Sequence, residues 1–221
     1  MVTSLHAEIS SPKINLVMSD VQKLIDEFWD WFLAHRSDFD TLKDPNMPFW
    51  NAAVAQLKSL DGHLWFELSS NVDGTREFII TAEGHHEAFP IVEAIAAQAP
   101  KVQGWKFIAL KPPMGFEFVT NYEGIPFDPN VMWFLPLKRG SNRHDLGLRI
   151  GVPNLSPANK RQAENAVLII LDTALGERVA ALDIGYVEVA VLPESPRSEG
   201  YLELKKLPSY IEWHKRKLLG T

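Results

Sequence analysis

Apolar residues recur at helical spacing from residue 19 onward. The periodic residues in the first stretch are Val21, Leu24, Ile25, Phe28, Phe32 and Leu33. This spacing predicts an amphipathic helix over residues 19–36. Pro48 can begin a second helix, because proline is tolerated in a first helical turn, and that helix reaches about Leu60. Residues 19–61 are therefore expected to form a helical pair.

Beyond residue 61 the pattern changes to short strand-like runs and helices that begin at a proline. The expected strands are residues 63–69, 76–82, 105–110, 116–120, 131–137, 146–152 and 184–192. Helices are expected over residues 87–98 and 156–175, each with a proline in its first turn. Residues 121–130 are rich in turn residues and residues 138–145 are polar and basic, and both segments predict loops. The remainder, residues 193–221, is a proline-punctuated tail.

The order strand, strand, helix, strand occurs twice, in residues 63–110 and 131–192. The first strands contain a similar tripeptide, Leu64-Trp65-Phe66 in one and Met132-Trp133-Phe134 in the other. One such unit leaves sheet edges exposed and one face of its sheet uncovered. We therefore expect the two units to pair into one larger sheet with both helices on one face. The alternative is that a common order of elements recurs by coincidence.

The expected fold class is α+β, with a mainly antiparallel sheet, helices on one face and an N-terminal helical pair. In one version of this fold the repeated units are two ferredoxin-like ββαβ halves. No flexible linker separates the parts, so a single domain over residues 1–221 is expected. Its parts are the helical pair 19–61, a first half 63–120, a second half 131–192 and a C-terminal tail 193–221.

Composition narrows the class of protein. The chain has 221 residues, 46% of them hydrophobic and 23% charged, with a net charge of −6 and no Cys. These values are those of an average soluble globular protein, and the lack of Cys excludes disulfides and a thiol nucleophile. Residues 1–13 lack the features of a secretory signal, and the longest uncharged run, 45–57, is too short to span a bilayer. We expect a cytoplasmic protein with no membrane contact.

The net acidity argues against a nucleic-acid partner, which requires a basic surface. Residues 197–217 differ from the rest of the chain, because six bases and three acids give them a charge of +3. This segment is interpreted as an exposed tail of mixed charge. An anionic partner is the alternative.

The segment Glu83-Gly84-His85-His86-Glu87 resembles a reactive site most closely. It lies where a strand gives way to a helix, and helix starts favour anions because their N–H groups are free. His85, His86 and Glu87 are therefore candidate catalytic residues, since histidine acts as a base or metal ligand near neutral pH. We favour a helix cap with exposed histidines, because a metal would need distant ligands such as His63, Glu67 or His144.

Basic residues gather around the predicted turn between residues 131–137 and 146–152. They are candidate ligand-binding residues for a phosphate or carboxylate: Lys138, Arg139, Arg143, His144 and Arg149. The favoured interpretation is a solvated loop. Four carboxylates near the second helix and last strand, Asp172, Glu177, Asp183 and Glu188, have no spacing that specifies acid–base catalysis. Glycine-rich nucleotide loops and the nucleophile elbow are absent from the sequence.

Large rings are abundant, with 7 Trp, 12 Phe and 4 Tyr. They are sufficient to fill a core, which is the simplest interpretation. The pairs Trp29/Trp31 and Phe49/Trp50 are the best candidates for an aromatic groove that holds a ligand, because a helical pair cannot bury every ring.

The stretch 76–112, REFIITAEGHHEAFPIVEAIAAQAPKVQGWKFIALKP, resembles an uncharacterised bacterial protein family of unknown function. The pattern is a strand that ends in ITA-x-G, a helix that opens with x-AFP, and AP…GW before the next strand. Residues 200–210, GYLELKKLPSY, are similar in the same way. The resemblance implies a bacterial origin and brings no activity, substrate or catalytic residue.

Three functions fit these observations. The first is a non-catalytic binding or regulatory module that holds a protein partner or a second copy through a sheet face, a sheet edge or the helical pair. The second is a small-ligand binder with an aromatic pocket. The third is a hydrolase-like or metal-assisted enzyme that uses His85, His86 and Glu87. We favour the first because no catalytic motif is present, and we expect no cofactor or resident metal.

Overall fold

A computed structural model describes residues 18–42, 47–69, 73–137 and 146–219. The fold is α+β, as the sequence predicts, with short helices and several small open sheets. The chain divides into two compact units, Met1–Leu60 and Asp61–Thr221. The single domain expected from the sequence stays a prediction.

The N-terminal unit is helical. It contains α1 (Met18–Ala34), α2 (Arg36–Thr41) and α3 (Pro48–Lys58). The predicted helical pair is confirmed in α1 and α3, and the short α2 is an addition. Pro48 occupies the first turn of α3, where its missing N–H removes no helical bond. Ring contacts join the helices, because Phe32 stacks on Phe39 with ring centroids 4.6 Å apart.

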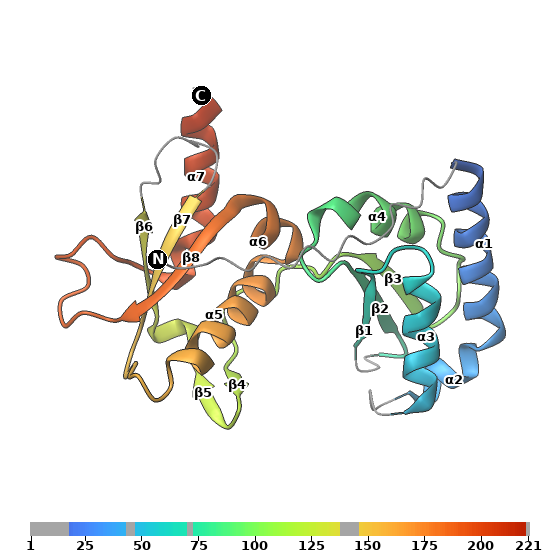
Figure 1. The fold of residues 1–221 in the computed structure, drawn as a ribbon, viewed down its shortest axis with the longest axis horizontal. Coiled ribbons are helices and arrows are strands. Elements are labelled where there is room, and N and C mark those ends of the chain that lie inside the picture. Colours follow the sequence, from blue (N-terminus) through green and yellow to red (C-terminus); the bar gives the residue numbers. More distant parts are fainter. Residues whose placement is uncertain (1–17, 43–46, 70–72, 138–145, 220–221) are drawn as a thin grey trace, which may run out of the picture. The chain divides into compact units, whose positions relative to one another are not determined.

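The first half of the second unit has four elements in the predicted order. They are β1 (Trp65–Leu68), β2 (Arg76–Thr81), α4 (Phe89–Ala97) and β3 (Trp105–Ala109), with one 3₁₀ turn, His86–Ala88, before α4. β1 pairs antiparallel with β2, and β2 pairs parallel with β3 (Figure 1). A parallel pair needs a crossover, which α4 supplies.

The second half repeats this order. Its elements are β6 (Trp133–Leu137), β7 (Leu146–Val152), α5 (Lys160–Leu175), α6 (Glu177–Asp183) and β8 (Ile184–Val191). β6 and β7 are again antiparallel, and β7 and β8 are again parallel. The predicted double occurrence of strand, strand, helix, strand is therefore confirmed.

The expectation of one larger sheet is wrong, because the halves form separate sheets. The sheet of the second half has the order β8-β7-β6-β9, in which β9 (Leu202–Glu203) comes from the predicted tail. β9 pairs antiparallel with β6, opposite Trp133 and Phe134. It thereby occupies the edge of β6 to which a strand of the first half would have to bind to form one larger sheet.

The core of the second half lies on one face of this sheet. Every second residue of β7 is buried there: Leu146, Leu148, Ile150 and Val152. Apolar positions of α5 such as Val167 and Ile170 cover them at helical spacing. Leu207 and Ile211 of α7 (Leu207–Leu219) belong to the same cluster. Within the described ranges, no helix is both long and apolar enough to cross a membrane.

Three local expectations are wrong. The predicted strand 116–120 and loop 121–130 contain instead a hairpin of β4 (Thr120–Tyr122) and β5 (Ile125–Phe127), beside α5 (Figure 1). Glu123 and Gly124 have φ angles of 48° and 81°, which suit a two-residue turn. The tail contains the helix α7, and α6 follows Gly176 directly. Two further 3₁₀ turns are Pro129–Val131 and Leu204–Lys206.

The helix predicted from residue 156 begins at Lys160. The cause is a local bond, because the Asn159 side-chain oxygen accepts the Ser156 N–H at 2.7 Å. The Asn159 amide also donates to the Asn154 carbonyl at 3.1 Å. These bonds hold residues 154–159 as a turn.

Candidate functional site

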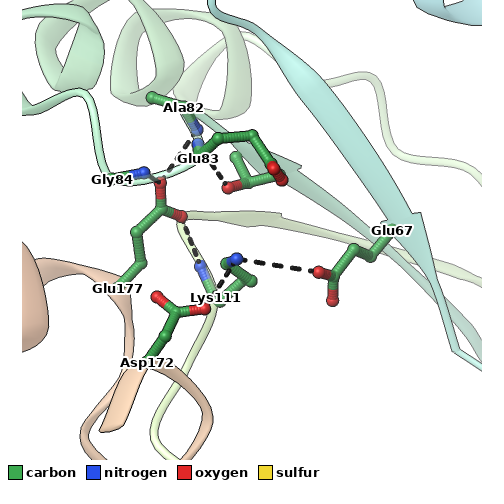
Figure 2. A network of polar contacts seen from close by, with 8 residues as sticks. Glu67, Ala82, Glu83, Gly84, Lys111, Asp172 and Glu177 are labelled. Carbon is green, nitrogen blue, oxygen red and sulfur yellow. Dashed lines mark hydrogen bonds and ion pairs between the residues drawn. The ribbon is translucent and has the colours of Figure 1, made fainter. Parts of the chain in front are cut away.

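The carboxylate of Glu177 is the centre of a polar network that joins the two ββαβ halves (Figure 2). Its Oε1 accepts the Ala82 N–H at 2.9 Å and the Gly84 N–H at 3.0 Å. Its Oε2 accepts the Lys111 N–H at 3.2 Å. The Glu177 residue is fully buried. Hydrogen bonds to a charged acceptor are stronger than neutral ones, so three of them offset part of the cost of burying this carboxylate.

The local backbone explains why the amides converge. Glu83 and Gly84 follow β2 with φ angles of 53° and 81°, so the chain turns sharply and the N–H groups of Ala82 and Gly84 are both directed to Glu177. The Thr81 hydroxyl accepts the Glu83 N–H at 3.0 Å and fixes this turn. The result is an anion-binding loop at the start of the α4 segment.

Gly176 brings Glu177 to this loop. Its φ is 79°, a left-handed conformation that favours glycine. A Cβ at this position would lie 2.8 Å from the Pro113 nitrogen and 3.0 Å from the Lys111 carbonyl oxygen. The Glu177 N–H then donates to that same Lys111 carbonyl at 3.0 Å. Only glycine allows the end of α5 to approach residues 111–113 this closely.

A cation and two further carboxylates lie beside Glu177. The Lys111 Nζ is 2.6 Å from Asp172 Oδ2 of α5 and 3.8 Å from Glu67 Oε1 of β1 (Figure 2). Burial raises the pKa of Glu67, and the Lys111 charge opposes that rise. Burial disfavours the charge of Lys111, but the Asp172 carboxylate outweighs it, so the pKa of Lys111 is raised. Lys111 therefore stays cationic between the two halves.

The network connects parts of this chain to one another. The anion-binding loop holds the carboxylate of Glu177, and Lys111 holds Asp172. Backbone hydrogen bonds connect the halves at the same place, because Met114 and Gly115 donate their N–H groups to the Thr173 and Ala174 carbonyls at the end of α5. These contacts between the two halves are here called the joint. The carboxylate that the amides after β2 bind is thus supplied by the second half of the same chain.

The candidate catalytic residues His85, His86 and Glu87 are exposed beside this joint. His86 Nδ1 lies 3.4 Å from Glu87 Oε2. His85 lies against His63, with ring centroids 4.2 Å apart, and His63 Nδ1 is 2.9 Å from Asp61 Oδ1. Among the residues that the structure describes, no three His, Asp or Glu side chains are placed to share a metal ion.

Of the basic candidates, Lys138, Arg139, Arg143 and His144 lie outside the described residues. Arg149 is described, and it forms an ion pair with Glu188 of β8. The register of β7 and β8 causes this contact, because Arg149 and Glu188 are direct partners in the parallel ladder. Tyr186, two residues along β8, also donates its hydroxyl to Glu188 at 3.4 Å.

The candidate aromatic residues of the helical unit pack on one another. Trp29 is buried, and Trp31 stacks on Phe49 with ring centroids 5.5 Å apart and on His35 at 4.5 Å. These contacts agree with the interpretation that the rings fill a core. Stacked and edge-on rings stabilise such a core beyond the area that they bury.

A second candidate site follows the outer edge of β8, which pairs with no strand within the described residues other than β7. It is a groove, here called the β8 groove, between this strand and the helices α5 and α6. Its lining residues are Lys160, Glu164, Leu168 and Leu171 of α5, Ala180 of α6 and Ile184, Gly185, Tyr186, Val187, Glu188 and Val189 of β8. The sequence pattern of 184–192 predicted the strand but not its position at a sheet edge, which depends on pairing with a distant strand.

No family model, no curated protein and no solved structure matches this chain. The resemblance of residues 76–112 to an uncharacterised bacterial family stays a prediction.

Proposed function

We propose that this protein is a binding module that acts through protein–protein contact, and that its contact surface is the free edge of β8 with the β8 groove. The observation that carries the proposal is the eight-residue edge strand, which pairs with β7 on one side and with no other strand among the described residues. Unpaired edges attract further strands, because their N–H and C=O groups are already aligned.

The direction of the backbone groups supports this proposal. The Leu192 N–H donates to the Val152 carbonyl of β7 at 3.1 Å. Backbone groups alternate in direction along a strand, so even-numbered residues of β8 bond to β7 and odd-numbered residues are directed away from it. Val187, Val189 and Val191 therefore present their N–H and C=O groups at the free edge.

The groove has the form that an added strand requires. Its lining includes four consecutive residues, Tyr186 to Val189, which alternate between the two faces of the sheet. A hollow that touches all four lies along the edge of the strand and not on one face. The two depressions that form the groove, of about 280 and 530 Å³, share Leu168, Tyr186 and Val187. The two depressions therefore adjoin along residues 184–189 of β8.

Exposed apolar side chains border the same edge. Val191 has 62% of its surface exposed, Leu168 has 55% and Tyr186 has 41%. Exposed edge strands are normally protected by charge or proline, and β8 carries one charged residue, Glu188, which Arg149 already neutralises. A partner strand would cover this apolar surface.

The test uses peptides as probes. Octapeptides are selected from a randomised display library on dilute wild-type protein, and their affinity is measured for Val191→Lys and for Val119→Lys, a second exposed valine far along the chain in a loop. We expect Val191→Lys to weaken binding about tenfold, because it introduces a charge at an apolar contact, and Val119→Lys to leave it unchanged.

Amide hydrogen exchange by NMR then locates the contact. A bound peptide is expected to slow exchange at Val187, Val189 and Val191 and to leave Glu188 and Ala190 unchanged, because these amides are already bonded to β7. Peptides that bind Val191→Lys and wild type equally, or that protect other segments instead, would overturn the proposal.

A further inference from the structure

We infer, resting on the proposed function, that the strand added at the edge of β8 is β8 of a second copy of this chain. The two strands run antiparallel, and Val189 of one copy lies opposite Val189 of the other. The sheet of the second half thus continues across a two-fold axis. Such an interface uses the same surface on both copies and therefore closes as a dimer.

The free edge is complementary to itself in this register. Val187, Val189 and Val191, whose backbone groups are directed away from β7 and pair with no other strand in the described part of the chain, are all valines. With Val189 opposite Val189, Val187 of each copy lies opposite Val191 of the other. Each of these pairs exchanges two backbone hydrogen bonds, and β-branched residues are favourable cross-strand neighbours. Val191, the most exposed residue of β8 among the large apolar side chains, becomes covered.

Other registers are less favourable for reasons of charge and coverage. Moving the axis to Glu188 places this carboxylate directly opposite its own copy, and like charges opposite one another are destabilising. Moving the axis to Val187 leaves Val191 beyond the paired region. In the register centred on Val189, Glu188 lies opposite the small apolar Ala190 and keeps its ion pair with Arg149.

The walls of the groove fit an apolar strand. The valines of the second copy face α5, where the exposed Leu168 lines both depressions. The charged groups on this wall already pair with one another, since Lys160 Nζ is 3.7 Å from Glu164 Oε1. The strand that enters therefore needs no charge on this face, and the single charge of β8, Glu188, lies on the other face. At the opposite end of the sheet, β9 has two residues, which is too short to extend the assembly.

Single cysteines test the register directly, because the chain contains no Cys of its own. In Val189→Cys the two Cα atoms are expected about 5.5 Å apart, which a disulfide can bridge. In Val187→Cys the two sites are four residues apart along the strands, about 13 Å, and cannot be bridged. Under mild oxidation Val189→Cys is expected to form a covalent dimer on a non-reducing gel, and Val187→Cys and the exposed loop variant Val119→Cys are expected to remain monomeric.

The double variant Val187→Cys/Val191→Cys is expected to restore the cross-link, because each new cysteine meets its opposite. Light scattering of the wild type is expected to give twice the chain mass of 24.9 kDa. Val191→Lys is expected to raise the dimer Kd about tenfold, and Val119→Lys is expected to leave it unchanged.

Outcomes that overturn the inference differ from those that overturn the proposed function. A monomeric wild type whose Val187, Val189 and Val191 amides are protected by a selected peptide overturns self-pairing and leaves the edge as a site for other proteins. Cross-linking of Val187→Cys alone, or of Val119→Cys as fast as Val189→Cys, overturns the register. No protection of the edge by peptide or by a second copy overturns both.

Discussion

The two ββαβ halves share their topology and differ in how the loop after the second strand is held. In both halves a left-handed residue stands two positions beyond that strand, Glu83 with a φ of 53° and Asn154 with a φ of 55°. In the second half the loop is held locally, because Asn159 bonds to Ser156 and Asn154, three and five residues away. In the first half the loop amides bond to Glu177, which is 95 and 93 residues away from Ala82 and Gly84.

This difference shows how one backbone turn can serve two purposes. A loop that satisfies its own polar groups makes a half independent of its neighbour. A loop that leaves amides unpaired requires an acceptor from elsewhere, and here the acceptor comes from the start of α6. The second half is held together locally, and the first half depends on the second through Glu177 and Lys111.

The outer strands differ as well. β3 has five residues and includes Lys106, which forms an ion pair with Glu77 at 2.8 Å. Lysine on an edge strand discourages further pairing. β8 has eight residues, four of them valine or isoleucine, and its single charged residue is neutralised within the sheet. The second half therefore combines a self-contained loop with an edge strand that pairs on one side only among the described residues.

Removing the Glu177 carboxylate is expected to break the joint with the largest effect. Glu177→Ala leaves the N–H groups of Ala82, Gly84 and Lys111 without their acceptor, at a cost of about 3 to 5 kcal/mol of unfolding free energy. Glu177→Gln is expected to cost less, because one oxygen remains to accept from Ala82 and Gly84. Urea unfolding followed by circular dichroism measures both.

The matched control is Glu87→Ala, which removes an exposed carboxylate near the same loop. It is expected to change the unfolding free energy by less than about 0.5 kcal/mol. If Glu177→Ala is as stable as this control, the two halves do not depend on the joint.

Adding one methyl group at Gly176 is expected to be nearly as damaging. Gly176→Ala combines a disfavoured backbone conformation with a Cβ 2.8 Å from the Pro113 nitrogen, and a loss of about 3 kcal/mol is expected. Gly74→Ala is the control, because Gly74 has almost the same φ, 78°, and open space around its Cβ.

The difference between these two glycine variants contains the close approach together with the extended ψ of 151° at Gly176, which disfavours other residues. Gly74→Ala is expected to cost about 1 kcal/mol, from the backbone conformation alone. Thermal unfolding compares them. Equal losses in the two variants would mean that the end of α5 does not press against residues 111–113.

Removing the local hydrogen bonds of Asn159 in the second half is expected to lower the unfolding free energy by a moderate amount. Asn159→Ala removes the acceptor of the Ser156 N–H and the donor to the Asn154 carbonyl, at a cost of about 1 to 2 kcal/mol. Asn51→Ala, at an exposed position of α3, is the control. An Asn159→Ala loss as large as that of Glu177→Ala would remove the distinction between the two loops.

The repeated order of elements could be predicted from the sequence because each element has its own hydrophobic periodicity and is bounded by proline, glycine or polar turn residues. β7 is confirmed at the predicted bounds, 146–152, since large apolar residues alternate there with Gly147, Arg149 and Gly151. α7 was missed because residues 193–221 were interpreted as a tail interrupted by prolines. Pro208 instead occupies the first turn of α7, where proline is permitted, and Leu207 and Ile211 lie one helical turn apart.

The joint could not be predicted, because its partners are far apart in the sequence. Glu177 was noted only as one of four carboxylates, and no local pattern connects it with Ala82 or Gly84. The separate sheets have the same cause, since the strand that occupies the edge of β6 is β9, which contributes only two residues, Leu202 and Glu203. Gly176-Glu177 directly after a long helix is the one local signal that was available.

The smallest expected effect concerns Glu67, at the edge of the joint. Burial raises its pKa, so the folded protein binds a proton here more readily than the unfolded chain does. This preference adds stability below the usual carboxyl pKa of 4.5, and the added stability is lost as the pH rises through the raised value. Glu67→Gln cannot titrate, so at about pH 7 it is expected to equal or exceed the wild type by less than about 1 kcal/mol, since the side chain is half exposed.

The dependence on pH separates this cause from a general change of charge. The difference between Glu67→Gln and wild type is expected to disappear below pH 4.5, where the wild-type carboxyl is protonated as well. Glu87→Gln removes one exposed charge and is expected to show no such trend in urea unfolding at the two pH values. A loss of stability in Glu67→Gln at neutral pH would mean that attraction to Lys111 exceeds the cost of burial, and that Glu67 belongs to the joint as firmly as Asp172 does.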